Sequence, residues 1–188
     1  MDLYALPDGR VIVIRPIRPD DQARLQASHA GLSALTRYRR FLTAKPNLST
    51  ADATYLAVID GLDHYALVAT FAAHADDEDA PIIGVARFVR PPDDPHAAEF
   101  AIVVGDDWQG RGVGRELMGR LVDAAVTLGV QRFQATMLAD NAAIQRLSER
   151  FAAGPVRRLR QGNTFEVEFS LPTRREDATA IIAGCAGS

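Results

Sequence analysis

Apolar and β-branched residues occur along this chain in short runs, separated by turn-forming residues or by segments with helical spacing. A run of Val, Ile, Tyr or Phe bounded by glycine, proline or acidic residues is typical of a β-strand. On this basis the sequence predicts strands at residues 11–15, 65–73, 82–89, 98–104, 133–138, 156–159 and 165–171.

Helical periodicity occupies much of the remaining sequence. The clearest helix is expected where Leu117, Leu121 and Ala125 form an apolar stripe and Gly129 follows as a stop. Ser49 and Asp52 have the spacing of a capping box, which favours a helix start at Ser49. Helices are therefore predicted at residues 19–30, 33–42, 49–58, 112–128 and 141–151.

Three segments lack either pattern. Residues 76–79 are all acidic and resemble a hairpin loop, and residues 90–95 contain prolines that cannot occupy a central strand. Residues 173–188 are small, polar and glycine-ended, as frayed termini commonly are. We expect one domain at residues 1–172, followed by a flexible C-terminal tail at residues 173–188.

Composition narrows the functional classes. The net charge of −3 gives no electrostatic reason to expect a nucleic-acid partner. The single cysteine, Cys185, cannot form an internal disulfide, which is typical of a reducing compartment. No apolar stretch approaches the roughly 20 residues needed to span a membrane, and the first residues lack the layout of a signal peptide. A cytoplasmic protein without a membrane partner is expected.

The segment from Glu99 to Arg115 carries the strongest chemical signal. It is predicted to run from a strand through a glycine-rich turn, Gln109-Gly-Arg-Gly-Val-Gly114, into the longest helix. The start of a helix attracts anions because its first N–H groups are unpaired and the helix dipole is positive there. Glycines allow the backbone to approach a bulky group closely, and Arg111 and Arg115 add positive charge. The expected guest is a phosphate or pyrophosphate.

Other phosphate-binding motifs fit this turn poorly. A P-loop ends in Gly-Lys-Ser/Thr, and this turn has no lysine. The dinucleotide fingerprint requires a third glycine where Arg115 stands. It also requires a ribose-binding acid about 20 residues further on, and Asp140 comes too late in the sequence to be that acid. A tight turn that binds no ligand remains the structural alternative.

The turn matches the Gln/Arg-x-x-Gly-x-Gly/Ala signature, and the chain thereby resembles the GNAT acetyltransferase superfamily. The resemblance extends in element order over residues 10–171. Residues 33–41, 63–64, 86–89 and 98–100 are similar to the catalytic domain of bacterial protein lysine acetyltransferases of the Pat type. The resemblance implies an α/β (α+β) fold with a mixed, mostly antiparallel sheet of about seven strands and helices on both faces.

The resemblance also implies acetyl-CoA as cosubstrate and assigns residues to it. Val104 would donate its N–H to the thioester carbonyl, where negative charge develops. Asn141 would contact CoA near the point where two strands diverge, and Arg111 and Arg115 would pair with phosphates. The backbone of Ile102, Val103 and Val104 would bind the pantetheine arm, and the amides of Gln109, Gly110, Arg111, Gly112, Val113 and Gly114 would hold the pyrophosphate.

Glu99 is the candidate general base. An alkyl ammonium has a pKa near 10.4 and must lose a proton before it attacks a thioester. A solvated strand residue or an ion-pair partner is the structural alternative for Glu99. Many superfamily members protonate the leaving thiolate with a tyrosine, but here that place belongs to Ser148, whose hydroxyl is a poor acid.

The remaining polar residues are weaker candidates. His64 lies near the expected acceptor cleft, but a structural role is the more common one for such a histidine. The other histidines have no metal-ligand spacing, so no metal is expected. Arg37, Arg39 and Arg40 either form a solvated face or line the acceptor site.

The sequence and the resemblance therefore favour an N-acetyltransferase that acts on a primary amine, with a protein lysine as the expected acceptor. A small-amine acetyltransferase and a CoA-binding module without turnover are the alternatives.

Overall fold

A single sheet of eight strands organises the chain, in the spatial order β1-β2-β3-β4-β5-β6-β8-β7. The computed structural model describes residues 2–72 and 80–173. The strands are β1 Asp2–Ala5, β2 Val11–Pro16, β3 His64–Phe71, β4 Gly84–Val89, β5 Ala97–Val104, β6 Arg132–Leu138, β7 Arg157–Gln161 and β8 Thr164–Ser170. The helices are α1 Gln22–Ala30, α2 Ala34–Phe41, α3 Thr50–Ala57, α4 Val113–Thr127 and α5 Ala142–Phe151, with short 3₁₀ turns at Pro19–Asp21 and Asp106–Trp108.

The structure confirms the predicted α/β fold and adds one strand. All seven predicted strands are present, and the eighth is β1, which pairs with β2. The turn between them contains Asp8 and Gly9, and Gly9 adopts a φ of +84°. Asp-Gly is a strong hairpin signal, but β1 is so short that the sequence pattern alone did not reveal it.

The predicted helices are also present, and their caps explain where they begin. Ser49 and Asp52 form the expected capping box at the start of α3. Ser33 caps α2, accepting a hydrogen bond from the Thr36 N–H at 3.2 Å. Gly129, with a φ of +85°, follows the end of α4. The predicted acidic loop at residues 76–79 and nearly all of the C-terminal tail lie outside the described residues.

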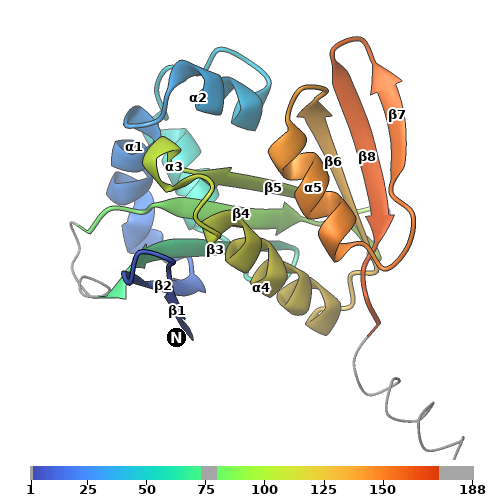
Figure 1. Cartoon of the computed structure of the whole chain (residues 1–188), viewed down its shortest axis with the longest axis horizontal. Helices are drawn as coiled ribbons and strands as arrows, with labels where there is room; N and C mark the ends of the chain where they lie inside the picture. The colour runs from blue at the N-terminus through green and yellow to red at the C-terminus, as the bar shows by residue number, and fades with distance from the viewer. Residues whose placement is uncertain (1, 73–79, 174–188) are drawn as a thin grey trace, which may run out of the picture.

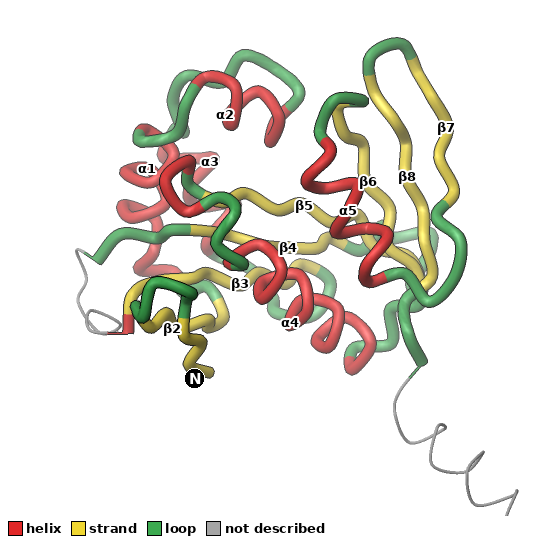
Figure 2. Tube along the Cα trace, in the orientation of Figure 1, coloured by secondary structure: helices red, strands yellow, loops and turns green. Residues whose placement is uncertain are grey.

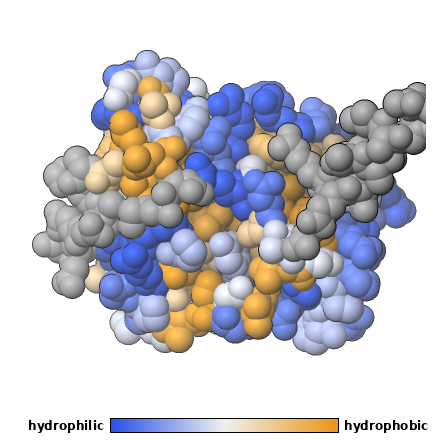
Figure 3. Space-filling model, turned by 90° about the horizontal axis from the view of Figure 1, so that it is seen from below, coloured by the Kyte–Doolittle hydropathy of each residue, from blue (hydrophilic) through white to orange (hydrophobic). Residues whose placement is uncertain are grey.

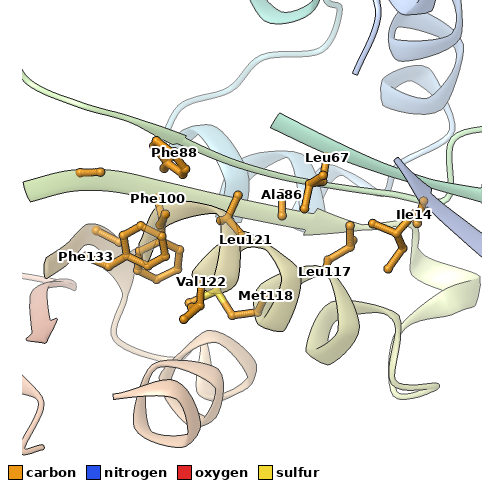
Figure 4. Close-up of a cluster of buried hydrophobic side chains, with 14 of the residues drawn as sticks. Ile14, Leu67, Ala86, Phe88, Phe100, Leu117, Met118, Leu121, Val122 and Phe133 are labelled. Atoms are coloured by element: carbon orange, nitrogen blue, oxygen red, sulfur yellow. The ribbon is translucent and has the colours of Figure 1, made fainter. Parts of the chain in front are cut away.

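The helices cover the sheet from both sides (Figure 1). Leu117, Met118 and Leu121 of α4 are fully buried and point toward sheet residues that include Phe88 and Phe100 (Figure 4). The α5 helix packs against this same cluster, whereas α1 and α3 cover the opposite face and enclose a second, smaller core. Viewed from below, hydrophobic residues reach the surface in separate groups among hydrophilic ones (Figure 3).

The one parallel pairing in the sheet, between β5 and β6, is short. Its register joins Ala97 to Arg132 and Glu99 to Gln134, and the pairing ends there. Beyond Glu99 the two strands diverge, so that the sheet opens between β5 and β6 (Figure 2). None of the described helices is long and apolar enough to cross a membrane.

Candidate active site

The opening between β5 and β6 contains a cavity of about 640 Å³. Its walls come from both diverging strands, from α2 and α5, and from the glycine-rich turn before α4. The structure thus brings together the predicted residues Glu99, Ile102, Val104, Gly112 and Asn141. The volume is in the range of small-molecule sites.

The backbone of β5 has polar groups that face this cavity. The Gly105 N–H donates to the Ile83 carbonyl at 2.9 Å. In an antiparallel pair every second residue bonds to the partner strand, so this bond shows which residues of β5 bond to β4. Odd-numbered residues such as Val103 therefore bond to β4, whereas the N–H and C=O groups of Ile102 and Val104 point toward β6. Because β6 has diverged, both groups of Ile102 and the N–H of Val104 are available to an extended, amide-bearing ligand, whereas the Val104 carbonyl accepts a hydrogen bond from the Gln109 side chain.

The glycine-rich turn presents backbone amides at the start of α4. Gly110 and Gly112 have φ angles of +74° and +90°, a region that favours glycine. Gly112 is the N-cap residue and provides no side chain to cap the first amides of α4. Those N–H groups also have no partner inside the helix, so the turn meets the predicted requirements of an anion site.

Side-chain hydrogen bonds fix the turn relative to α2. Asp106 accepts hydrogen bonds from the Ser33 and Thr36 hydroxyls, each at 2.7 Å. The Gln109 amide group donates to the Val104 carbonyl at 3.1 Å and to the Thr36 hydroxyl at 3.3 Å. The signature glutamine therefore connects the end of β5, the turn and α2.

The cavity is strongly cationic, although the whole chain is acidic. Its charged lining residues are five arginines and one carboxylate: Arg39, Arg40, Arg115, Arg146, Arg150 and Glu99. Arg146 and Arg150 were not among the site residues predicted from the sequence. Their spacing of four residues on α5, beside Ile144 and Leu147, is the signal that places them on one helix face. The lining fits a ligand with several negative charges.

Two predicted phosphate-binding arginines contact the N-terminal hairpin. The Arg111 guanidinium bonds to the Asp8 carboxylate at 2.8 Å and is not part of the cavity wall. Arg115 lines the cavity and donates to the Tyr4 hydroxyl at 2.9 Å. A phosphate would have to compete with Asp8 for Arg111.

Glu99 lies where the pairing of β5 and β6 ends. Its side chain is exposed and contributes to the main cavity and to a groove of about 630 Å³ along β6, β7 and β8. Arg40 is its electrostatic neighbour: burial lowers the pKa of the Arg40 guanidinium, and the Glu99 charge opposes that shift. Glu99 can therefore reach a group that enters from either side.

Asn141 and Ser148 have different positions relative to the cavity. Asn141 is buried, lines the cavity and caps α5, accepting a hydrogen bond from the Ile144 N–H at 3.5 Å. Ser148 is fully buried away from the cavity lining, and its hydroxyl donates to the Ile144 carbonyl at 3.0 Å. The hydroxyl of Ser148 is therefore already used within the helix.

His64 and the three arginines of α2, Arg37, Arg39 and Arg40, lie in different surroundings. His64 accepts a hydrogen bond from Arg87 at 2.9 Å, and burial together with the Arg87 charge lowers its pKa to about 4. Arg39 and Arg40 line the cavity, whereas Arg37 donates to the Ala30 carbonyl at 3.4 Å and lines neither the cavity nor the groove. The three arginines do not form one uniform surface.

Comparisons with known proteins agree with this geometry. The Acetyltransferase (GNAT) domain family matches residues 11–153. Acetyltransferase Pat of Mycolicibacterium smegmatis is 40% identical over 150 residues, which make up 79% of this chain and 43% of that protein. Acetyltransferase PA5475 of Pseudomonas aeruginosa is 33% identical over 143 residues, or 76% of this chain and 75% of that protein.

A solved structure is also similar along most of the chain. The crystal structure of the GNAT domain of S. lividans PAT matches with a TM-score of 0.77 and 27% identity, covering 90% of this chain and 96% of that one. The chain spans less than half the length of the mycolicibacterial relative. The family match and the shared fold confirm the predicted resemblance, and this chain belongs to the GNAT acetyltransferase family, with similarity to its Pat-type members.

Proposed function

We propose that this chain transfers an acetyl group from acetyl-CoA to a primary amine. The observation that carries the proposal is the cationic cavity between β5 and β6, with a glycine-rich helix start at one side and a single carboxylate, Glu99, in its wall. Acetyl-CoA combines phosphates with an amide-bearing arm and a thioester. Each of these features has a complementary group in the cavity.

The first part of the proposal concerns binding. The amides of residues 109–114 hold the pyrophosphate, and Arg115 supplies charge beside them. Arg146 and Arg150 project from α5 into the same cavity and suit the remaining phosphate. The N–H and C=O groups of Ile102 bond the pantetheine arm as an adjacent strand would, and the N–H of Val104 points the same way.

The second part concerns chemistry. Glu99 takes a proton from the acceptor ammonium, directly or through a water, so that the nitrogen lone pair can attack the thioester carbonyl carbon. Val104 donates its N–H to the carbonyl oxygen while negative charge develops there. A C–N bond forms, the C–S bond breaks, and CoA leaves as a thiolate. The nitrogen gives up its second proton to yield the neutral amide, and uptake of a proton by the thiolate gives free CoA. Ser148 takes no part, because its hydroxyl bonds to Ile144.

The acceptor is proposed to be a lysine on a protein. Two Pat proteins are among the relatives of this chain. Glu99 also opens onto the broad groove along β6, β7 and β8, which gives a large acceptor room beside the base. Arg39 and Arg40 carry positive charge on the α2 side, which would orient acidic partners and repel polycationic small molecules.

A labelling experiment tests both levels of the proposal. The chain is incubated with labelled acetyl-CoA, a cell lysate and a panel of small amines, and thiol release is followed in parallel. A labelled protein band supports the lysine acceptor. Efficient turnover of a small amine without any labelled protein would favour the small-amine alternative, and CoA binding without thiol release would indicate a module without turnover.

A further inference from the structure

A second cavity lies between the sheet and helices α1, α2 and α3. It has a volume of about 70 Å³, enough for several waters or a small functional group. Arg40, Phe41 and Val103 belong to the walls of both this cavity and the larger one, so the two adjoin. The small cavity is mostly apolar, but two of its lining residues are Arg40 and Arg87.

Arg87 is an unusual lining residue because it is charged and buried. Its side chain comes from the middle of β4 and is only 5% exposed. Its guanidinium donates to the Leu56 carbonyl at 3.2 Å and to the His64 ring at 2.9 Å, and both partners are neutral near pH 7. No carboxylate among the described residues pairs with it. A buried charge is normally paired, so this arginine lacks the partner that burial requires.

Arg40 adds a second positive charge beside Arg87. Burial, and after it the nearby Arg40 charge, lower the pKa of Arg87 to about 9. The Glu99 charge acts on Arg40 in the opposite direction to burial and raises the pKa of its guanidinium. A carboxylate placed between the two guanidiniums would relieve their repulsion and accept charge-assisted hydrogen bonds.

The position of Arg40 and Arg87 relative to Glu99 indicates that the carboxylate belongs to a substrate. Arg87 stands opposite Ala101 on β5, and Glu99, Ala101 and Val103 point to the same face of the strand. Two residues along a strand span about 7 Å. An acid group held by the arginines would therefore lie a few bonds away from the group that reacts beside Glu99.

We propose that Arg40 and Arg87 form a carboxylate-binding subsite beside Glu99, which holds an acid group of the substrate during transfer. The proposal rests on the proposed acyltransferase function. The acid group belongs either to the acceptor, as a carboxylate near the reacting amine, or to the acyl chain of a dicarboxylic thioester. In both cases Arg40 and Arg87 determine specificity and touch the substrate.

The experiment has one arm for each source of the carboxylate. In the acceptor arm, the rate of acetyl transfer from acetyl-CoA is measured for 4-aminobutyrate and for butylamine. The same rate is compared between a peptide whose lysine is flanked by glutamate and one in which glutamine replaces that glutamate. In the donor arm, the affinities for succinyl-CoA and butyryl-CoA are compared by calorimetry, which requires no turnover. A preference of about tenfold or more for the acid-bearing member is expected in one arm.

Variants connect that preference to the two arginines. Arg87→Met should abolish the preference while leaving acetyl-CoA binding intact, because Arg87 lines only the small cavity, and Arg40→Met should abolish the preference as well. Arg87→Lys should recover only part of it, because lysine keeps the charge but not the forked donors. Arg37→Met, on the same helix as Arg40 but outside both cavities, is the matched control and should behave like the unmodified chain.

A third measurement, of thermal stability, tests the carboxylate subsite even if no tested amine reacts. Sodium propionate should raise the midpoint of thermal unfolding above that in sodium chloride of equal ionic strength, and Arg87→Met should remove the difference. If neither arm shows a preference and propionate gives no added stability, the subsite is refuted. Transfer to the acid-free lysine peptide is a separate readout, so that loss of the subsite and failure of the proposed function are distinguishable.

Discussion

Gly112→Glu tests the proposed pyrophosphate site most directly. Gly112 has a φ of +90°, and a residue with a side chain pays about 1–2 kcal/mol of strain in this region. The new Cβ atom would lie 3.3 Å from the Tyr4 hydroxyl, so Tyr4 must shift slightly. The carboxylate would also place a negative charge at the first amides of α4, where phosphate is expected.

We expect the dissociation constant for CoA to rise by about 100-fold in this variant. Losing two charge-assisted hydrogen bonds to phosphate corresponds to about 3 kcal/mol, and the repulsion between like charges adds to that loss. Isothermal titration calorimetry measures the affinity, and denaturant unfolding measures the loss of stability, expected to be about 1–2 kcal/mol.

Gly129→Glu provides the matched control. Gly129 follows the other end of α4, has a φ of +85°, and has no atom within 4 Å of an added Cβ. It should therefore lose similar stability through backbone strain without changing CoA affinity. If Gly112→Glu binds CoA as tightly as the unmodified chain, the assignment of the glycine turn to pyrophosphate is refuted.

The remaining expectations concern the base, the charged acceptor side and the buried histidine. Glu99→Gln should slow transfer about 10²–10⁴-fold at neutral pH without weakening CoA binding, and its rate should recover as rising pH deprotonates the amine; full activity at neutral pH would assign Glu99 a structural role. Replacing Arg39 and Arg40 by glutamine should slow acetylation of a protein acceptor, with an effect that shrinks at high salt; Arg37→Gln is the control, and a salt-independent loss would contradict steering. The pKa of His64 is about 4 in the folded chain against 6.5 ordinarily, so its contribution, at most about 3 kcal/mol, is present above pH 6.5 and lost as the pH falls toward 4. His64→Gln should flatten that part of the stability profile in denaturant titrations, and an unchanged slope would show that other groups cause it.

Sequence reasoning located the features that depend on neighbouring residues. The capping box at Ser49, the stop at Gly129 and the turn at Gly112 each follow from interactions within a few positions of the chain. The glycine turn was recognisable for the same reason, since its charge preference arises from the helix that begins there. Local rules of this kind were sufficient to predict nearly every strand and helix.

The parts that escaped sequence reasoning depend on packing between distant segments. Arg87 looks like an ordinary strand residue, and only the fold brings it beside Arg40 of α2. Likewise, Arg111 was predicted to meet phosphate, but the hairpin that contains Asp8 reaches it from more than a hundred residues away. No short-range pattern distinguishes such arginines from solvent-exposed ones.

The divergence of β5 and β6 gives the sheet two edges in its interior. An unpaired strand edge usually exchanges its amide hydrogens quickly and can accept a foreign strand. Here the edge amides of Ile102 and Val104 lie between α2 and α5, in a space lined by arginines, which disfavours the approach of another chain. If the pantetheine arm occupies this edge as a strand would, hydrogen exchange at these two amides should slow when CoA binds, while exchange at Val103, already bonded to β4, should change little. Hydrogen exchange at the opening in the sheet would then report directly whether CoA is bound there.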